Sequence, residues 1–307
     1  MHEQRTRAVA LRRAAHTIIA GMLSIGCRTD SPVAPAAPFE STTATASRQA
    51  TTSSRILFVR QLEPFFHLFS MDDDGTNVRM LSSAFGAVST AAWAPDGKRI
   101  VLSATMGSDV DLAIFTMNDD GTGITRLTNP PLDCDDHFPV ALGKRIVFLR
   151  ACPPDATVIV MNADGTGLTS LVDGTTGRIG ASPRGDAIAY SKGGDLWLLD
   201  VSTGATTRLT NTPAFEFEPS FSPSGKRIAY SVNAAGTLSI LTMNTDGTMI
   251  TLVAPKAYTP MWSPDGKRLA FVHELISDIS VMNIDGTSVT NLTQTPAPEL
   301  PVAWTRY

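Results

Sequence analysis

The sequence predicts an all-β fold for residues 55–307, a six-bladed β-propeller of four-stranded antiparallel blades. Three observations lead to this fold. A two-part motif recurs at intervals of about 42 residues. Each part reads as two short strands joined by a tight turn, and six repeat units occupy residues 55–307. The first copy lacks its first strand, and the end of the chain supplies one.

The first part of the motif is an apolar residue, then Ser/Ala-Pro-Asp-Gly-Lys-Arg, then an alternating strand. Pro presets φ at the start of a turn and Gly relieves its end, so this segment predicts a tight connection between strands A and B of a blade. Copies lie at residues 93–100, 221–228 and 262–269, with degenerate copies at 141–146 and 181–186. The residue that begins strand B falls at positions 55, 99, 145, 187, 227 and 268, which gives six units.

The second part is an apolar strand, then Asn-x-Asp-Gly-Thr, then a strand that ends in Leu-Thr. Asp-Gly between alternating strands is a strong hairpin signal, because a type I′ turn needs positive φ at both central positions. The hairpin Gly falls at positions 75, 121, 165, 204, 247 and 286, which again gives six units. The motif resembles part of a calcium-binding loop, but no copy has the twelve-residue ligand spacing and the closing Glu, so we interpret it as the C–D hairpin turn.

Ring closure is predicted from the two ends of the repeat region. The first unit starts directly at strand B, with Arg55-Ile56-Leu57-Phe58. The last residues, Pro301-Val302-Ala303-Trp304, form a strand A with no further strand after it. We therefore expect the C-terminal strand to complete the first blade and to leave no unpaired sheet edge.

Residues 1–26 have the pattern of an export signal. Arg5, Arg7, Arg12 and Arg13 precede an apolar segment, residues 14–26, that is too short to span a bilayer. The segment ends in Leu23-Ser24-Ile25-Gly26-Cys27, which resembles a bacterial lipobox except for Ser24, where Leu is usual. This resemblance implies lipidation at Cys27 and anchoring in the cell envelope, in the periplasm or on the outer-membrane side. The alternative is an ordinary cleaved signal and a free cysteine.

Residues 27–54 are rich in Ser, Thr, Ala and Pro and contain almost no large apolar residue. A segment of this composition cannot bury enough surface to offset the entropy lost on ordering. We expect a disordered tether between the lipid anchor and the propeller.

The two motifs together resemble the WD-like repeats of the TolB-type propeller family over residues 55–307. Proteins of that family carry an N-terminal α/β domain ahead of the propeller, where this chain has only the tether. The resemblance implies a periplasmic binding scaffold, and it does not by itself imply a role in the Tol–Pal system.

Several functions find no support in the sequence. A net charge of −4 gives no basic face for nucleic acid, and the chain has no Gly-x-Ser-x-Gly elbow, phosphate loop or His-Glu-x-x-His motif. We therefore expect no catalytic residues, no cofactor and no bound metal, and a monomer attached to the membrane only through its lipid. One alternative stays open: His67, His137 and His273 are all expected in B–C or D–A loops, which lie on one face, as in a propeller enzyme or a metal-dependent carbohydrate-binding protein.

The B–C and D–A loops share one face, here called the variable-loop face, and they differ in length and chemistry from blade to blade. Their acidic residues outnumber their basic ones, with a net charge of about −10. We therefore predict that this face binds a cationic protein or peptide; the alternative is that the acids only keep the surface soluble. Strand A is innermost, so acids near its start are expected to ring the channel mouth, with Phe215, Phe217 and Trp304 nearby. The candidate binding residues are Asp135, Asp136, His137, Glu216, Glu218, Glu299, His67 and His273.

Cys134 and Cys152 flank the A–B hairpin of the third blade, and both lie nine residues from Gly143 of its turn. Antiparallel pairing about that turn places them opposite each other, and an exported protein folds in an oxidising compartment. The sequence therefore predicts a Cys134–Cys152 disulfide.

Overall fold

The computed structural model describes residues 54–94, 96–274 and 276–306. Within these ranges the regular structure is all strand, and no helix long and apolar enough to cross a membrane occurs there. The predicted signal peptide, Cys27 and the predicted tether lie outside the described residues.

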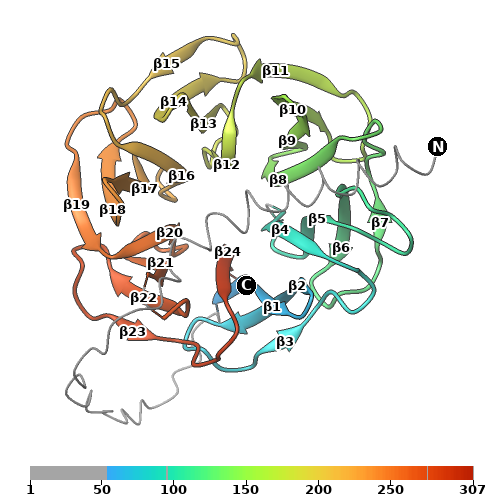
Figure 1. Ribbon diagram of the computed structural model, residues 1–307, viewed down its shortest axis with the longest axis horizontal. Helices are drawn as coiled ribbons and strands as arrows, with labels where there is room; N and C mark the ends of the chain where they lie inside the picture. The colour runs from blue at the N-terminus through green and yellow to red at the C-terminus, as the bar shows by residue number, and fades with distance from the viewer. Residues whose placement is uncertain (1–53, 95, 275, 307) are drawn as a thin grey trace. The chain divides into compact units, whose positions relative to one another are not determined.

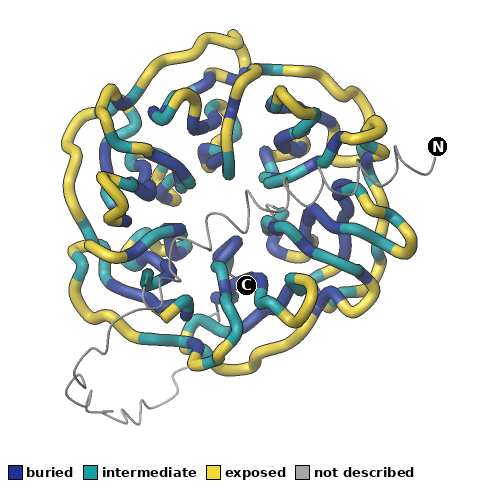
Figure 2. The backbone as a smooth tube through the Cα atoms, viewed as in Figure 1, coloured by how far each residue is buried: buried dark blue, intermediate teal, exposed yellow. Residues whose placement is uncertain are grey.

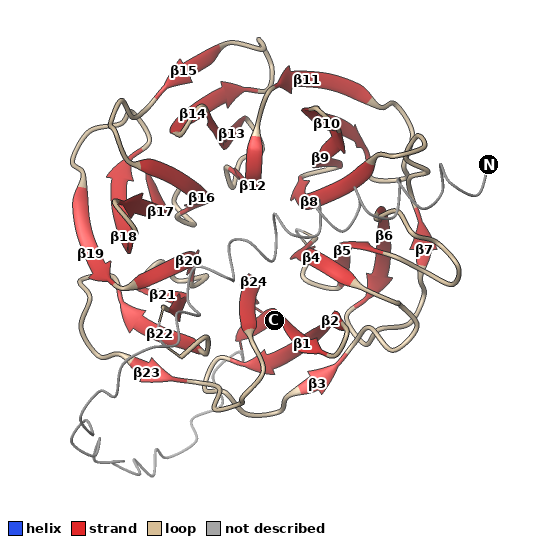
Figure 3. Ribbon diagram, viewed as in Figure 1, coloured by secondary structure: helices blue, strands red, loops and turns tan. Residues whose placement is uncertain are grey.

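The described residues form six antiparallel sheets of four strands each, arranged as blades in a ring (Figures 1 and 3). The centre of such a ring is the channel of a propeller. The first blade contains β24 (Glu299–Arg306), β1 (Ser54–Leu62), β2 (Phe65–Asp72) and β3 (Arg79–Met80), and the second contains β4 (Val88–Trp93), β5 (Arg99–Ala104), β6 (Ala113–Asn118) and β7 (Thr125–Arg126). The third contains β8 (Asp135–Leu142), β9 (Arg145–Cys152), β10 (Asp155–Asn162) and β11 (Thr169–Asp173), and the fourth contains β12 (Thr176–Ala181), β13 (Ala187–Lys192), β14 (Asp195–Asp200) and β15 (Thr206–Arg208). The fifth contains β16 (Phe215–Phe221), β17 (Arg227–Ala234), β18 (Thr237–Asn244) and β19 (Thr251–Pro255), and the sixth contains β20 (Ala257–Trp262), β21 (Arg268–His273), β22 (Ile279–Asn283) and β23 (Thr290–Asn291).

The C-terminal strand closes the ring. β24 pairs antiparallel with β1, with Ile56 opposite Trp304 and Leu57 opposite Ala303. The indole Nε1 of Trp304 also donates a buried hydrogen bond to Ser54 Oγ at 3.0 Å. The predicted six-bladed fold and its closure by the C-terminal strand are therefore confirmed.

The apolar core lies between the blades. The buried side chains fall into six clusters, and each cluster joins two neighbouring blades. Figure 2 shows the buried backbone in the inner and middle strands, while the outermost strands are exposed. Each blade is thus held by contacts with both of its neighbours, and burial of this apolar surface drives the packing of the ring.

The Asn-x-Asp-Gly-Thr segments form the expected C–D turns. In the second blade, Asp120 Oδ1 accepts hydrogen bonds from the backbone N of Thr122 at 2.9 Å and from its Oγ1 at 2.6 Å. The hydroxyl of Thr122 leads the interactions that lower the pKa of Asp120. The same bonds recur at Asp164, Asp246 and Asp285. These carboxylates are therefore engaged within their own turns, which agrees with the hairpin interpretation.

The glycine of each of these turns also touches the neighbouring blade. Gly121 has φ of +86°, and a Cβ placed on it would lie 2.7 Å from the carbonyl oxygen of Leu81 in the first blade. Gly165 approaches the oxygen of Leu127 in the same way, also at 2.7 Å. The residue must be Gly both for its positive φ and because the next blade leaves no room for a side chain.

We predict that Gly121→Ala destabilises the propeller more than Gly143→Ala does. Gly143 also has positive φ, +61°, but a Cβ there would have no heavy atom within 4 Å, so only the left-handed backbone cost of about 1–2 kcal/mol applies. Gly121→Ala adds a clash with a backbone oxygen, and we expect at least about 1 kcal/mol more, measured by denaturant unfolding. Equal losses in the two variants would show that the approach to Leu81 carries no energetic weight.

Candidate binding face and central channel

The B–C and D–A loops meet on one face of the propeller, as predicted. Strand A runs away from this face and strand B returns to it, so the two loop sets alternate around the ring. Backbone hydrogen bonds tie them together: Gly86 N donates to Thr105 O at 3.0 Å, and Gln61 N donates to Pro298 O at 3.0 Å. This face can therefore present residues from neighbouring loops to one ligand.

Two of the candidate acids belong to the framework. Asp136 is fully buried, and Arg150 binds it through two bonds, Nε to Oδ1 at 2.7 Å and Nη2 to Oδ2 at 2.9 Å. Glu299 is also fully buried, and its Oε1 lies 2.5 Å from Arg60 Nε on the adjacent strand β1. Buried carboxylates need such partners. Neither charge is available at the channel mouth.

Glu216 is buried, and no described arginine forms an ion pair with it. It lies opposite Val232 in the register of β16 and β17, where the first and third blades place Arg60 and Arg150. Thr210 Oγ1 donates to Glu216 Oε2 at 2.9 Å, and Thr212 donates to Oε1. Burial raises the pKa of Glu216, and the threonine hydrogen bonds only partly oppose this shift.

Asp135 and Glu218 keep partial exposure. Asp135 Oδ1 accepts a hydrogen bond from Leu112 N at 2.7 Å. Glu218 sits at a bulge of β16 with φ of +53°, and its Oε2 accepts a hydrogen bond from Thr259 Oγ1 at 2.9 Å. Of the five acids expected to ring the mouth, only Asp135 and Glu218 are partly exposed, because Asp136, Glu216 and Glu299 are buried with polar partners.

The three histidines lie on strands of three different blades, which corrects their expected position in the loops. His67 is on β2, where Ser82 Oγ lies 3.5 Å from its Nδ1, and His137 is on β8, with Ser89 Oγ 3.4 Å from its Nδ1. His273 ends β21 in the sixth blade. Within the ranges that the structure describes, no group of three or more His, Cys, Asp or Glu residues could hold a metal ion. The three-histidine alternative gains no support from this geometry.

Exposed apolar side chains occur on the same face. Of the aromatic residues expected near the mouth, Phe215 is 38% exposed, while Phe217 and Trp304 are buried. Five further large apolar residues on or beside these loops are exposed, and none of them was predicted from the sequence. They are Leu62, Phe65, Val110, Leu132 and Ile276. In the sequence, each of them is a large apolar residue outside the alternating pattern of a strand. That pattern does not predict whether such a loop residue is buried or exposed.

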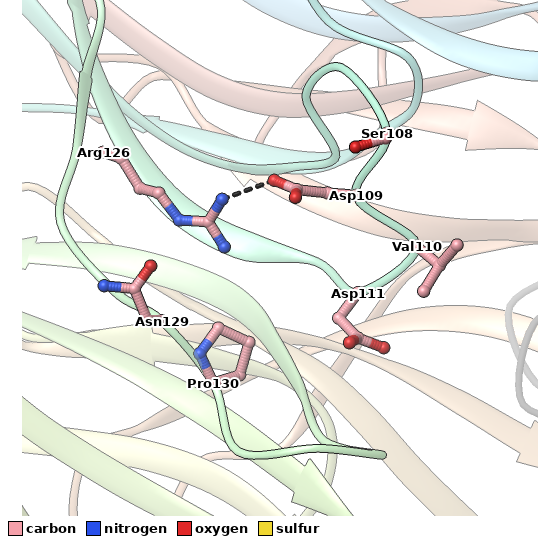
Figure 4. A pocket seen from close by; sticks show the side chains of 7 residues that line it. All are labelled: Ser108, Asp109, Val110, Asp111, Arg126, Asn129 and Pro130. Atoms are coloured by element: carbon pink, nitrogen blue, oxygen red, sulfur yellow. Dashed lines mark hydrogen bonds and ion pairs between the residues drawn. The ribbon is translucent and has the colours of Figure 1, made fainter.

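A polar pocket opens between the B–C loop of the second blade and the loop that leads to the third (Figure 4). In Figure 4 the guanidinium of Arg126 points to Asp109, and the two form an ion pair. Asn129, Pro130 and Val110 also line the pocket. The arrangement offers a carboxylate and an amide to a small polar group of a ligand.

A disulfide fixes one of the loops at this face. Cys134 and Cys152 are joined with S–S 2.06 Å and Cα–Cα 4.3 Å. Asp135 pairs with Ala151 in the register of β8 and β9, so the cysteines extend that pairing by one residue, as the sequence predicted. The bond ties the loop before β8 to the end of β9.

Residues 182–304 match the family model described as the TolB beta propeller domain. The comparison with curated proteins found no match. The structure is similar to TolB from Acinetobacter baumannii, with TM-score 0.71 and 21% identity over 82% of this chain and 66% of that one. It is also similar to a chain of a nidogen/laminin complex, with TM-score 0.65 and 12% identity over 82% of this chain and 98% of that one. An oligogalacturonate lyase solved with manganese has TM-score 0.53 and 11% identity over 77% of this chain and 73% of that one.

We predict that replacing both Cys134 and Cys152 by Ser lowers the free energy of unfolding by about 3 kcal/mol, because the bond closes a loop of 18 residues in the unfolded chain. Denaturant unfolding of the oxidised protein, the reduced protein and the double variant measures this. The reduced protein should match the variant, and a reductant should leave the variant unchanged. Reaction of both cysteines with a thiol reagent in the native exported protein would contradict the pairing.

Proposed function

We infer that this chain, which carries a TolB-type six-bladed propeller, is a non-catalytic scaffold that binds a protein or peptide through its variable-loop face. The observation that carries this proposal is the combination of exposed apolar side chains and accessible carboxylates on the same loops. The opposite face consists of short A–B and C–D turns that repeat from blade to blade.

Apolar exposure on these loops supports a protein ligand. Leu132 is 81% exposed in the loop before the third blade, Val110 is 61% exposed in the second blade, and Phe65 is 46% exposed in the first. Large apolar groups that loops hold in water are typical of interaction sites, where aromatic and aliphatic anchors supply most of the binding energy. Three neighbouring blades thus offer contacts to one extended partner.

The accessible charge on this face supports a cationic ligand. The pairs of Asp136 with Arg150 and of Glu299 with Arg60 cancel within the framework. Glu63, Asp133 and Asp155 are exposed on the same loops. An excess of accessible carboxylates attracts basic segments and accelerates encounter at low ionic strength.

We further propose that the protein is exported and held in the cell envelope by a lipid on Cys27. Cys27 lies outside the described residues, so this proposal is supported by the lipobox-like sequence at residues 23–27. The Cys134–Cys152 disulfide agrees with folding in an oxidising compartment.

The binding proposal is tested with a panel of peptides of equal length that differ in net charge and aromatic content. We expect cationic peptides with an aromatic residue to bind best. Phe65→Ser with Leu132→Ser should weaken binding by roughly thirtyfold to a thousandfold, because each of the two lost anchors costs about 1–2 kcal/mol. Glu63→Gln with Asp133→Asn should slow association and flatten its dependence on salt.

The matched control is Met249→Ser with Val289→Ser, which removes two exposed apolar side chains next to C–D turns on the opposite face. This variant should bind as the wild type does. Equal binding of cationic, neutral and acidic peptides would refute the charge argument. Equal losses in the control and in the Phe65 and Leu132 variant would refute the choice of face.

We predict that Cys27→Ser moves the protein from the membrane fraction to the soluble fraction of the envelope, because the thiol that carries the lipid is gone. Labelled fatty acid should attach to the wild type and not to the variant. Cys134→Ser with Cys152→Ser serves as the control and should retain the label. A wild type that never takes up label would contradict the anchor and leave the binding proposal untouched.

A further inference from the structure

The innermost strand of the fourth blade departs from the other strands at the channel. In β12, residues 177–179 oppose the single residue Tyr190 of β13, between the pairs Thr176–Ser191 and Gly180–Ala189. The corresponding bulge of β16 contains only residues 218 and 219. Gly177, with φ of +71°, permits the sharper bend. The extra residue of this bulge brings Arg178 to the channel.

Arg178 reaches across the channel. Its Nη1 donates a hydrogen bond at 3.1 Å to the backbone oxygen of Pro301 on β24. β24 belongs to the first blade and β12 to the fourth, and Figure 1 shows the two strands facing each other across the centre of the ring. The guanidinium therefore lies inside the channel and is fixed at one corner.

The remaining edge of this guanidinium has no acceptor. Nε of Arg178 is buried and has no hydrogen-bond partner, and no described oxygen accepts from Nη2. Arg150 shows what this edge normally binds, since its Nε and Nη2 hold the two oxygens of Asp136 at 2.7 and 2.9 Å. A buried donor of a charged group that has no acceptor raises the free energy of the folded state. We therefore infer that an anion binds at this edge.

Nearby groups decide which anion fits. Glu218 lies close enough to act electrostatically on Arg178, but within the described residues it forms no ion pair with Arg178, and Thr259 and Ser231 donate to its Oε2. A doubly charged anion would be repelled by Glu218, whereas a carboxylate carries one charge. A planar carboxylate also matches the two parallel N–H groups of the vacant edge.

We propose that the channel contains a carboxylate-binding site, in which the Nε and Nη2 of Arg178 bind the two oxygens of a ligand carboxylate. The site requires none of the exposed loop residues of the variable-loop face, so it stands independently of the proposed function. The carboxylate has two sources, a small free acid or the C-terminus of a peptide chain that enters the channel.

The test records the arginine Nε–Hε correlations of the full chain by NMR while acetate, triglycine or triglycine amide is added at constant ionic strength. The Arg178 signal is assigned by its loss in Arg178→Lys. We expect a saturable downfield shift of this signal with acetate or triglycine and none with triglycine amide or chloride. A response at lower concentration to triglycine than to acetate identifies a chain terminus as the ligand, and the reverse order identifies a small acid.

A thermal measurement provides a second readout. Acetate should raise the melting temperature of the wild type and of a control variant, Arg145→Gln. Arg145 is an exposed arginine at the start of β9. Acetate should not raise the melting temperature of Arg178→Gln. If Arg178→Gln does not fold, the NMR titration of the wild type decides alone. The proposal is overturned if neither carboxylate gives a saturable shift, or if chloride or triglycine amide gives the same one.

Discussion

The pairing of β24 with β1 is the constraint on which the rest of this structure depends. The two strands come from opposite ends of the repeat region, and their pairing brings the sixth blade against the first. Without it, the cluster that contains Phe58, Ala270 and Trp304 would be exposed, and β1 would present an unpaired edge. The channel depends on the same contact, because the carbonyl that anchors Arg178 belongs to Pro301 of the closing strand. A single long-range strand pair thus determines both the stability of the ring and the geometry at its centre.

Much of the fold could be predicted because its turns carry their own chemistry. Asp-Gly and Pro-x-Gly segments require particular φ values, and these are properties of single residues rather than of the tertiary structure. Pairing about Gly143 likewise fixed the partner of Cys134, because the register of a tight hairpin follows from its turn. What the turns do not show is the approach of Gly121 to Leu81, since the neighbouring blade is specified some forty residues away in the chain.

The candidate site was harder to predict because charge in a sequence does not reveal burial. Asp136 and Glu299 look like loop acids, yet each faces an arginine on the adjacent strand and is enclosed with it. Glu216 occupies the same register position but faces Val232, so its burial has a different electrostatic consequence. Arg178 differs from Arg60 and Arg150 for a similar reason: an additional residue in a bulge moves it out of the pairing pattern. No regular alternation signals such a bulge, because it is an irregularity of one strand.

The two proposed sites have opposite sign, and this difference bears on how a ligand would be held. The carboxylates of the variable-loop face are accessible, so salt screens their attraction for a cationic segment. The Nε of Arg178 is buried, so an ion pair formed there is screened much less. A peptide with a basic body and a free C-terminus would satisfy both sites, arriving through the outer charges and remaining through the inner one. Its association rate would then fall with added salt while its dissociation rate changed little, because the contact that retains it involves the buried Nε of Arg178.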